Sequence, residues 1–154
     1  MRYWTIALGL TVALGAGGSA LADAPIGVGM SLGFPTPIQM FAGGDPEPGR
    51  TQDVTAEYLL TDLANEVINL KADNDCDAHS WTVTDPSGTV VDQSAACAAG
   101  GQPVTLAVPP GKPVDQTQTV SLHVFDYQEG VTYTIHYKAY GVEGTANFTV
   151  SLLK

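Results

Sequence analysis

The densest group of residues able to do chemistry in this chain is a short acidic run at residues 73–77, which reads DNDCD. Carboxylates at alternating positions are the ligands that hard cations such as calcium prefer. The run is not an EF-hand loop, because the glycine of the sixth position and the glutamate of the twelfth are both missing. Asp73, Asp75 and Asp77 are therefore candidate ligands of a looser calcium site that backbone carbonyls would complete. The alternative is a solvated acidic loop.

Three histidines, His79, His123 and His136, are the other candidates for chemistry. Nucleophilic hydrolysis needs a serine or cysteine beside a histidine and an orienting acid, and the sequence contains no G-x-S-x-G elbow. A blue-copper site would need a cysteine, a histidine and a methionine late in the chain, but no methionine follows Met40. We therefore expect no catalytic site, no enzyme activity and no cofactor other than calcium.

Two cysteines, Cys76 and Cys97, flank a turn signal symmetrically. Residues 85–88 read DPSG, which places Asp, Pro and Gly where a type I turn favours them. If this turn is the tip of a hairpin, the two cysteines face each other across it. A single cysteine pair in an oxidising compartment is typical of a disulfide, so we predict one between Cys76 and Cys97.

The first 22 residues have the pattern of a secretory signal peptide. A basic start is followed by an apolar stretch that is too short to span a bilayer. Small residues, Ala20 and Ala22, occupy the positions that signal peptidase requires, which predicts cleavage before Asp23. The mature protein is then periplasmic or secreted, with no membrane insertion after processing.

The charge composition of the chain limits the classes of molecule that it can bind. The 154 residues carry 6 Lys and Arg against 16 Asp and Glu, for a formal net charge of −10. Such a charge repels nucleic-acid backbones and anionic lipid surfaces. We expect neither of these as a partner, and instead expect another envelope or secreted protein.

The elements that position these residues begin with a Gly- and Pro-rich segment at residues 23–50, interpreted as an extended arm with one strand near residues 37–41. A domain at residues 51–154 follows. Within it, residues 54–72 are ambiguous, because apolar residues recur both at helical spacing and in alternation. A single helix remains the alternative, but two strands are favoured because everything after this segment is β.

The remaining segments alternate apolar and polar residues over short runs, as at residues 81–84, 104–108, 120–124, 131–138 and 148–152. Several short alternating strands separated by turns are typical of an antiparallel β-sandwich, either immunoglobulin-like or jelly-roll. The same alternation assigns Tyr133 and Tyr137 to the core. The alternative is a sugar-stacking face that they would form with Tyr127, Tyr140 and Phe148.

Three runs in this order, residues 85–91, 108–112 and 129–134, resemble bacterial immunoglobulin-like sandwiches, in particular the domain of the intracellular proteinase inhibitor family. Residues 85–91 and 141–152 are also similar to pre-peptidase C-terminal domains. Either resemblance covers about residues 54–152 and implies a sandwich fold. The first also implies a peptidase inhibitor with a rigid exposed loop, for which residues 97–103 and 109–115 are the candidates.

The sequence thus predicts an exported, non-catalytic β-sandwich that works as a binding or interaction module. The alternatives are a secreted peptidase inhibitor and a calcium-dependent or glycan-binding accessory domain.

Overall fold

The computed structural model describes residues 27–43, 47–98 and 100–153. The predicted signal peptide, with its cleavage residues Ala20, Ala22 and Asp23, lies outside these ranges. Within them, no helix has both the length and the apolar character that a membrane crossing requires.

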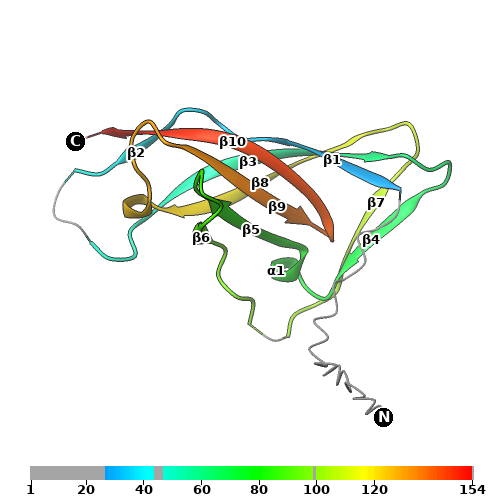
Figure 1. Ribbon diagram of the computed structural model, residues 1–154. Helices are drawn as coiled ribbons and strands as arrows, with labels where there is room; N and C mark the ends of the chain where they lie inside the picture. Colours follow the sequence, from blue (N-terminus) through cyan, green and yellow to red (C-terminus); the bar gives the residue numbers. More distant parts are fainter. Residues whose placement is uncertain (1–26, 44–46, 99, 154) are drawn as a thin grey trace, which may run out of the picture.

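The chain is mostly β and forms two stacked sheets (Figure 1). In the three-stranded sheet the order is β1 (Val28–Gly33), β3 (Thr51–Asp62) and β8 (Val114–His123). In the five-stranded sheet the order is β2 (Ile38–Phe41), β10 (Val142–Leu153), β9 (Thr132–Ala139), β5 (His79–Thr84) and β6 (Val90–Gln93).

A further antiparallel pair, β4 (Ile68–Ala72) and β7 (Val104–Val108), lies at one end of the sandwich. Two short helical turns complete the fold, α1 (Asp75–Ala78) and the 3-10 turn η1 (Val124–Asp126). The predicted all-β sandwich is therefore confirmed, with one departure from a purely antiparallel arrangement, because β2 runs parallel to β10.

Most of the sandwich is one long antiparallel ribbon folded over on itself. The pairs β3–β8, β4–β7 and β5–β6 are nested, each inside the previous one. Paired residues lie almost equally far before and after the turn at residues 85–88, which is the tip of the ribbon. Nested pairing of this kind brings strands that are far apart in the sequence side by side.

The disulfide between Cys76 and Cys97 is present, with a Cα–Cα distance of 5.7 Å. It links the two halves of the same ribbon covalently, at a point between the β4–β7 pair and the β5–β6 pair. The cysteines lie opposite each other about the 85–88 turn, as predicted, but not within a hydrogen-bonded ladder. Cys76 belongs to α1, and Cys97 belongs to the irregular segment after β6.

The core lies between the two sheets and is built by alternation. Along β9, Tyr133, Ile135 and Tyr137 are buried while the residues between them face outward. Tyr58 on β3 packs against Tyr137, with ring centroids 5.5 Å apart. Because each fully buried large apolar side chain stabilises the fold by about 1.5–3 kcal/mol, this layer supplies the main driving force for folding. The aromatic residues proposed for sugar stacking are mostly core residues instead; Tyr140 alone is partly exposed.

Residues 27–43, the first described part of the predicted arm, belong to the sandwich. The predicted strand near residues 37–41 is present as β2, but β1 was not predicted, and it pairs along its whole length with β3. The alternating side chains of Val28, Met30 and Leu32 pack against the core. Gly29 and Gly33 weaken the strand signal of this segment, so the sequence pattern indicated an extended arm. In the structure, β1 is already part of the sandwich.

The ambiguous segment at 54–72 forms two strands, β3 and β4, and the alternative of a single helix is wrong. Two of the residues that suggested helical spacing, Leu63 and Val67, are 74% and 54% exposed in the connection between the strands. The alternating set on β3, with Val54, Ala56 and Tyr58 buried, faces the core instead. Every second side chain of β3 from Val54 onward is therefore buried, as expected for a strand with one face on the core.

Candidate functional site

The polar face of the five-stranded sheet carries a groove of about 310 Å³ that opens to solvent. Its walls come from four adjacent strands, β6, β5, β9 and β10, and from the residue that follows β6. We call it the outer groove. It is lined by Ser80, Trp81, Thr82, Gln93, Ser94, His136, Tyr137, Lys138, Glu143, Gly144 and Thr145.

Alternation places the polar side chains of this groove outside the core. On β5, Trp81 and Val83 are buried, so Ser80 and Thr82 point away from the other sheet. On β9, the same rule turns His136 and Lys138 outward. The lining of the outer groove thus includes hydroxyl, amide and imidazole groups, which donate and accept hydrogen bonds.

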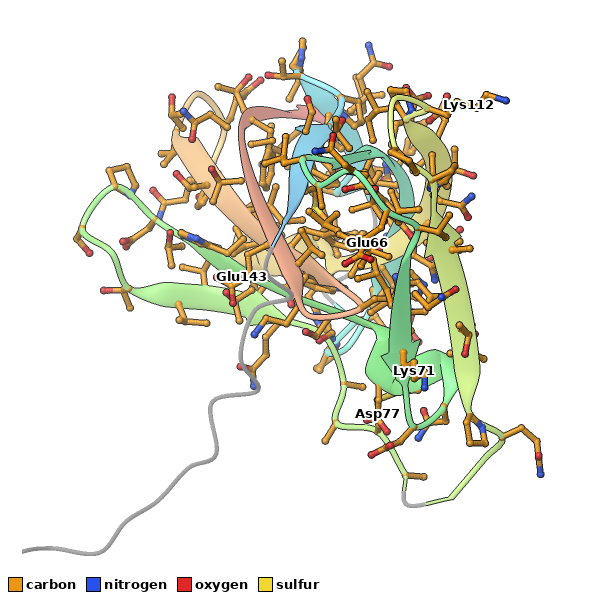
Figure 2. The ribbon with its side chains drawn as sticks, turned by 90° about the vertical axis from the view of Figure 1, so that its right-hand side faces the viewer. Glu66, Lys71, Asp77, Lys112 and Glu143 are labelled. Atoms are coloured by element: carbon orange, nitrogen blue, oxygen red, sulfur yellow. A yellow bond between two sulfur atoms is a disulfide. The ribbon has the colours of Figure 1, made fainter. Side chains whose placement is uncertain are left out.

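Two oppositely charged side chains in the lining of the outer groove neutralise each other. Lys138 Nζ lies 2.8 Å from Glu143 Oε1, and both side chains are substantially exposed. An exposed pair of this kind adds about 0–1 kcal/mol to folding stability, so the fold does not depend on it. Figure 2 shows Glu143 well apart from Lys112, which lies in the loop between β7 and β8. The groove presents a neutral, polar surface on an acidic protein.

A second, larger hollow of about 630 Å³ lies where the β1–β2 connection meets β3. Its lining includes Phe34, Pro37, Gln52, Thr55 and Glu57. The side chain of Gln52 accepts a hydrogen bond from the backbone N–H of Phe41 at 3.2 Å, which ties the end of β2 to β3. This hollow shares no lining residue with the outer groove and lies on a different part of the surface.

A buried carboxylate, Asp92 on β6, links the two sheets at the open edge of the sandwich. Its Oδ2 accepts hydrogen bonds from the backbone N–H of His123 at 2.8 Å and from the hydroxyl of Tyr127 at 2.9 Å. Its Oδ1 lies 2.8 Å from Nδ1 of His123. Asp92 is 2% exposed at its side chain, whereas that of His123 is 43% exposed. The network therefore has a buried acceptor and a half-exposed base.

These contacts shift the pKa values of both partners of Asp92. The hydrogen bond to Asp92 raises the pKa of His123 above its ordinary value. Burial, and then the negative charge of Asp92, raise the pKa of Tyr127, which stays a neutral hydrogen-bond donor at physiological pH.

The raised pKa of His123 gives the stability of the protein a pH dependence of definite sign. A group whose pKa is higher when folded than when unfolded contributes stability that is fully present below its unfolded pKa, about 6.5, and is lost as the pH rises through the folded pKa. We expect the difference in unfolding free energy between wild type and His123→Gln to be larger at about pH 6 than at about pH 9. Urea unfolding of both proteins across this range measures it.

The matched control for this experiment is His136→Gln, because His136 approaches only the hydroxyl of Thr84, at 3.4 Å. His79, whose pKa is lowered by burial, is present in every protein compared and cancels in the differences. A wild-type advantage over His123→Gln that stays constant from acid to alkaline pH would contradict the assignment.

The structure disperses the three candidate calcium ligands. Asn74 caps α1, its side chain accepting from the backbone N–H of Asp77 at 2.9 Å and donating to the Asp77 carboxylate. Asp73 and Asp77 line a hollow of about 330 Å³ beside the disulfide, and Figure 2 shows Asp77 at that end of the molecule. Asp75 acts elsewhere: burial is the main cause that raises the pKa of Tyr58 and Tyr140, and the charge of Asp75 adds to it. Within the described ranges, these three carboxylates do not converge to ligand distance.

The histidines lie apart from one another, and none has the partners of a catalytic triad. Nδ1 of His79 lies 2.9 Å from the hydroxyl of Tyr137, His123 faces Asp92, and His136 lies near Thr84. Sequence reasoning singled out all three histidines as candidates for chemistry but gave none of them a partner. It missed both Asp92 and the outer groove, since these depend on residues 31 and more positions apart. The outward alternation along β5 and β9 is the one sequence signal that pointed toward the groove.

Comparisons with known proteins leave this chain without a family. No family model matches the sequence, and no curated protein matches it. A solved chain described as "The structure of a beta-glucuronidase from glycoside hydrolase family 2" superposes with a TM-score of 0.44 and 13% identity. The match covers 79% of this chain but only 11% of that one. Likeness at this level carries no inference about activity.

Proposed function

We propose that this protein is an exported, non-catalytic binding module of the periplasm or cell exterior, and that the outer groove is its ligand-binding surface. The observation that carries the proposal is the groove itself, a hollow whose polar side chains come from adjacent strands. Side chains such as Thr82 and Lys138 face away from the core, so folding does not depend on them.

Export is supported by the signal-peptide pattern and by the disulfide. Both cysteines of the chain form the bond between Cys76 and Cys97, and such bonds persist in oxidising compartments outside the cytoplasm. The net charge of −10 favours solubility there and disfavours nucleic acids and anionic membranes as partners.

The chemistry of the groove favours a neutral, polar ligand. Hydroxyl and amide groups such as those of Thr82 and Gln93 bind through hydrogen bonds, and the pairing of Lys138 with Glu143 leaves no net charge to attract an ion. A segment of another envelope or secreted protein, with its many backbone donors and acceptors, fits this description. A neutral glycan is the alternative occupant with the same hydrogen-bonding chemistry.

A peptidase inhibitor is the second candidate function. The observation that favours it is the exposed segment after β6, which the disulfide anchors at Cys97. The other loop proposed for this role, residues 109–115, is shorter than predicted because β8 already begins at Val114.

Three matched substitutions test the binding surface. Thr82→Arg fills the outer groove with a long side chain, Thr55→Arg does the same in the second hollow, and Thr119→Arg places it on an exposed position of β8 outside both. All three replace a strand threonine whose side chain faces away from the core. Each oxidised protein is used as bait against the envelope and secreted fractions of the source cell.

We expect Thr82→Arg to lose at least about ten-fold of whatever the wild type captures, which corresponds to about 1.4 kcal/mol of binding free energy. Thr55→Arg and Thr119→Arg should capture as much as wild type. Loss with Thr55→Arg alone would move the binding surface to the second hollow. Unchanged capture by all three would refute a role for the groove and favour the disulfide-anchored segment.

A further inference from the structure

Beyond the outer groove, one cluster of side chains combines an imidazole with two carboxylates. Asp92 on β6, His123 at the end of β8 and Asp126 in η1 each offer one ligand atom, and these atoms all lie within 4.8 Å of one another. It is the one such group of three within the described ranges. β6 from one sheet, β8 from the other sheet and the helical turn η1 converge here, at the open edge of the sandwich.

The donor set is that of an open zinc site. Zinc binds imidazole nitrogen at about 2.0 Å and carboxylate oxygen at about 2.0–2.2 Å, with tetrahedral geometry, and non-structural sites have three protein ligands and a water. Ligand atoms around such an ion are about 3.3 Å apart. Nδ1 of His123 and Oδ1 of Asp92, at 2.8 Å, are already close to this separation.

The carboxylate of Asp92 is held in place by hydrogen bonds besides the one to the imidazole of His123. Oδ2 of Asp92 accepts from the backbone N–H of His123 and from the hydroxyl of Tyr127, so the carboxylate stays oriented when Oδ1 changes partner. Such supporting hydrogen bonds are what fix the ligands of metal sites. Asp126 is exposed, so its side chain is free to rotate toward the other two.

We propose that Asp92, His123 and Asp126 form a binding site for a divalent transition metal ion, with zinc as the best fit. The ion replaces the proton between Nδ1 of His123 and Oδ1 of Asp92, and the imidazole keeps its remaining proton on Nε2, which faces solvent. The carboxylate of Asp126 is the third protein ligand, and water completes the coordination. A metal held here joins the edge strand of one sheet to the edge strand of the other.

The test is a titration of tag-free, oxidised protein with zinc chloride by calorimetry, with cobalt(II) absorption as a second readout of tetrahedral coordination. Asp126→Asn is the deciding variant, since none of the hydrogen bonds of Asp92 involves Asp126 and we expect the fold to be retained. His136→Gln and Asp77→Asn are controls for an exposed histidine and an exposed acid elsewhere.

We expect one zinc ion per chain for the wild type, and an affinity at least about ten-fold weaker for Asp126→Asn. The intense visible bands of cobalt in the wild type should be lost in the same variant. Both controls should bind within about two-fold of wild type. The proposal is overturned by the absence of saturable zinc binding at millimolar concentration, by unchanged affinity of Asp126→Asn, or by binding that only Asp77→Asn removes.

Discussion

Replacing Asp92 by alanine is expected to lower the free energy of unfolding by about 3 kcal/mol. The substitution leaves the hydroxyl of Tyr127 and the backbone N–H of His123 without their acceptor at the junction of the two sheets. Tyr127 is 4% exposed, so its hydroxyl has little access to water as a substitute partner. A buried donor without a partner costs about 1–3 kcal/mol, and the substitution also removes the hydrogen bond to the imidazole of His123.

Urea unfolding of Asp92→Ala beside Asp53→Ala measures this effect. Asp53 is exposed and accepts a hydrogen bond at 2.6 Å from the hydroxyl of Ser121, so its removal should cost no more than about 1 kcal/mol. A double-mutant cycle with Tyr127→Phe then isolates the Asp92–Tyr127 pair. If Asp92→Ala is as mild as Asp53→Ala, Asp92 does not hold the two sheets together.

Loss of the disulfide is expected to have an effect of similar size. Cys76 and Cys97 are separated by 21 positions, and closing a loop of this length stabilises the folded state by about 3 kcal/mol in the chain-entropy model. In a chain of this size, that corresponds to a fall in melting temperature of about 10 °C. The disulfide lies between two short strand pairs of the ribbon, β4–β7 and β5–β6.

Calorimetric melting of the oxidised protein, of the same protein in reductant, and of the double variant Cys76→Ser, Cys97→Ser measures this effect. Reductant should lower the melting temperature of the first protein to that of the double variant, and should leave the double variant unchanged. An equal melting temperature with and without reductant would show that the bond between Cys76 and Cys97 does not stabilise the fold.

The parts of this fold that could be read from the sequence are those set by local chemistry. The turn at residues 85–88 is made by Asp85, whose Oδ1 accepts from the backbone N–H groups of Ser87 and Thr89, both at 2.9 Å. Gly88 supplies the positive φ of 84°. Because the cysteines are spaced evenly about this turn, the disulfide could be predicted as well. Alternation alone placed Tyr133 and Tyr137 in the core.

What the sequence did not reveal depends on contacts between distant segments. β1 has glycines within it and no clear strand signal, yet it is held by pairing with β3. Asp92 has no signal in the sequence, and nothing local pairs it with His123, which lies 31 positions later. Only folding of the ribbon brings β6 against the end of β8. The outer groove likewise requires four strands in one order, which periodicity cannot supply.

A map of amide chemical-shift changes in the oxidised, isotope-labelled protein would locate the binding surface residue by residue. The ligand captured by the wild type is added to it, and each shift is followed by NMR. If the outer groove is the binding surface, we expect the chemical-shift changes to be concentrated at Ser80, Thr82, His136, Lys138 and Thr145. The amides of the loops should show no change. Changes confined to residues 97–103 and 109–115 would contradict binding in the groove and would favour the peptidase inhibitor.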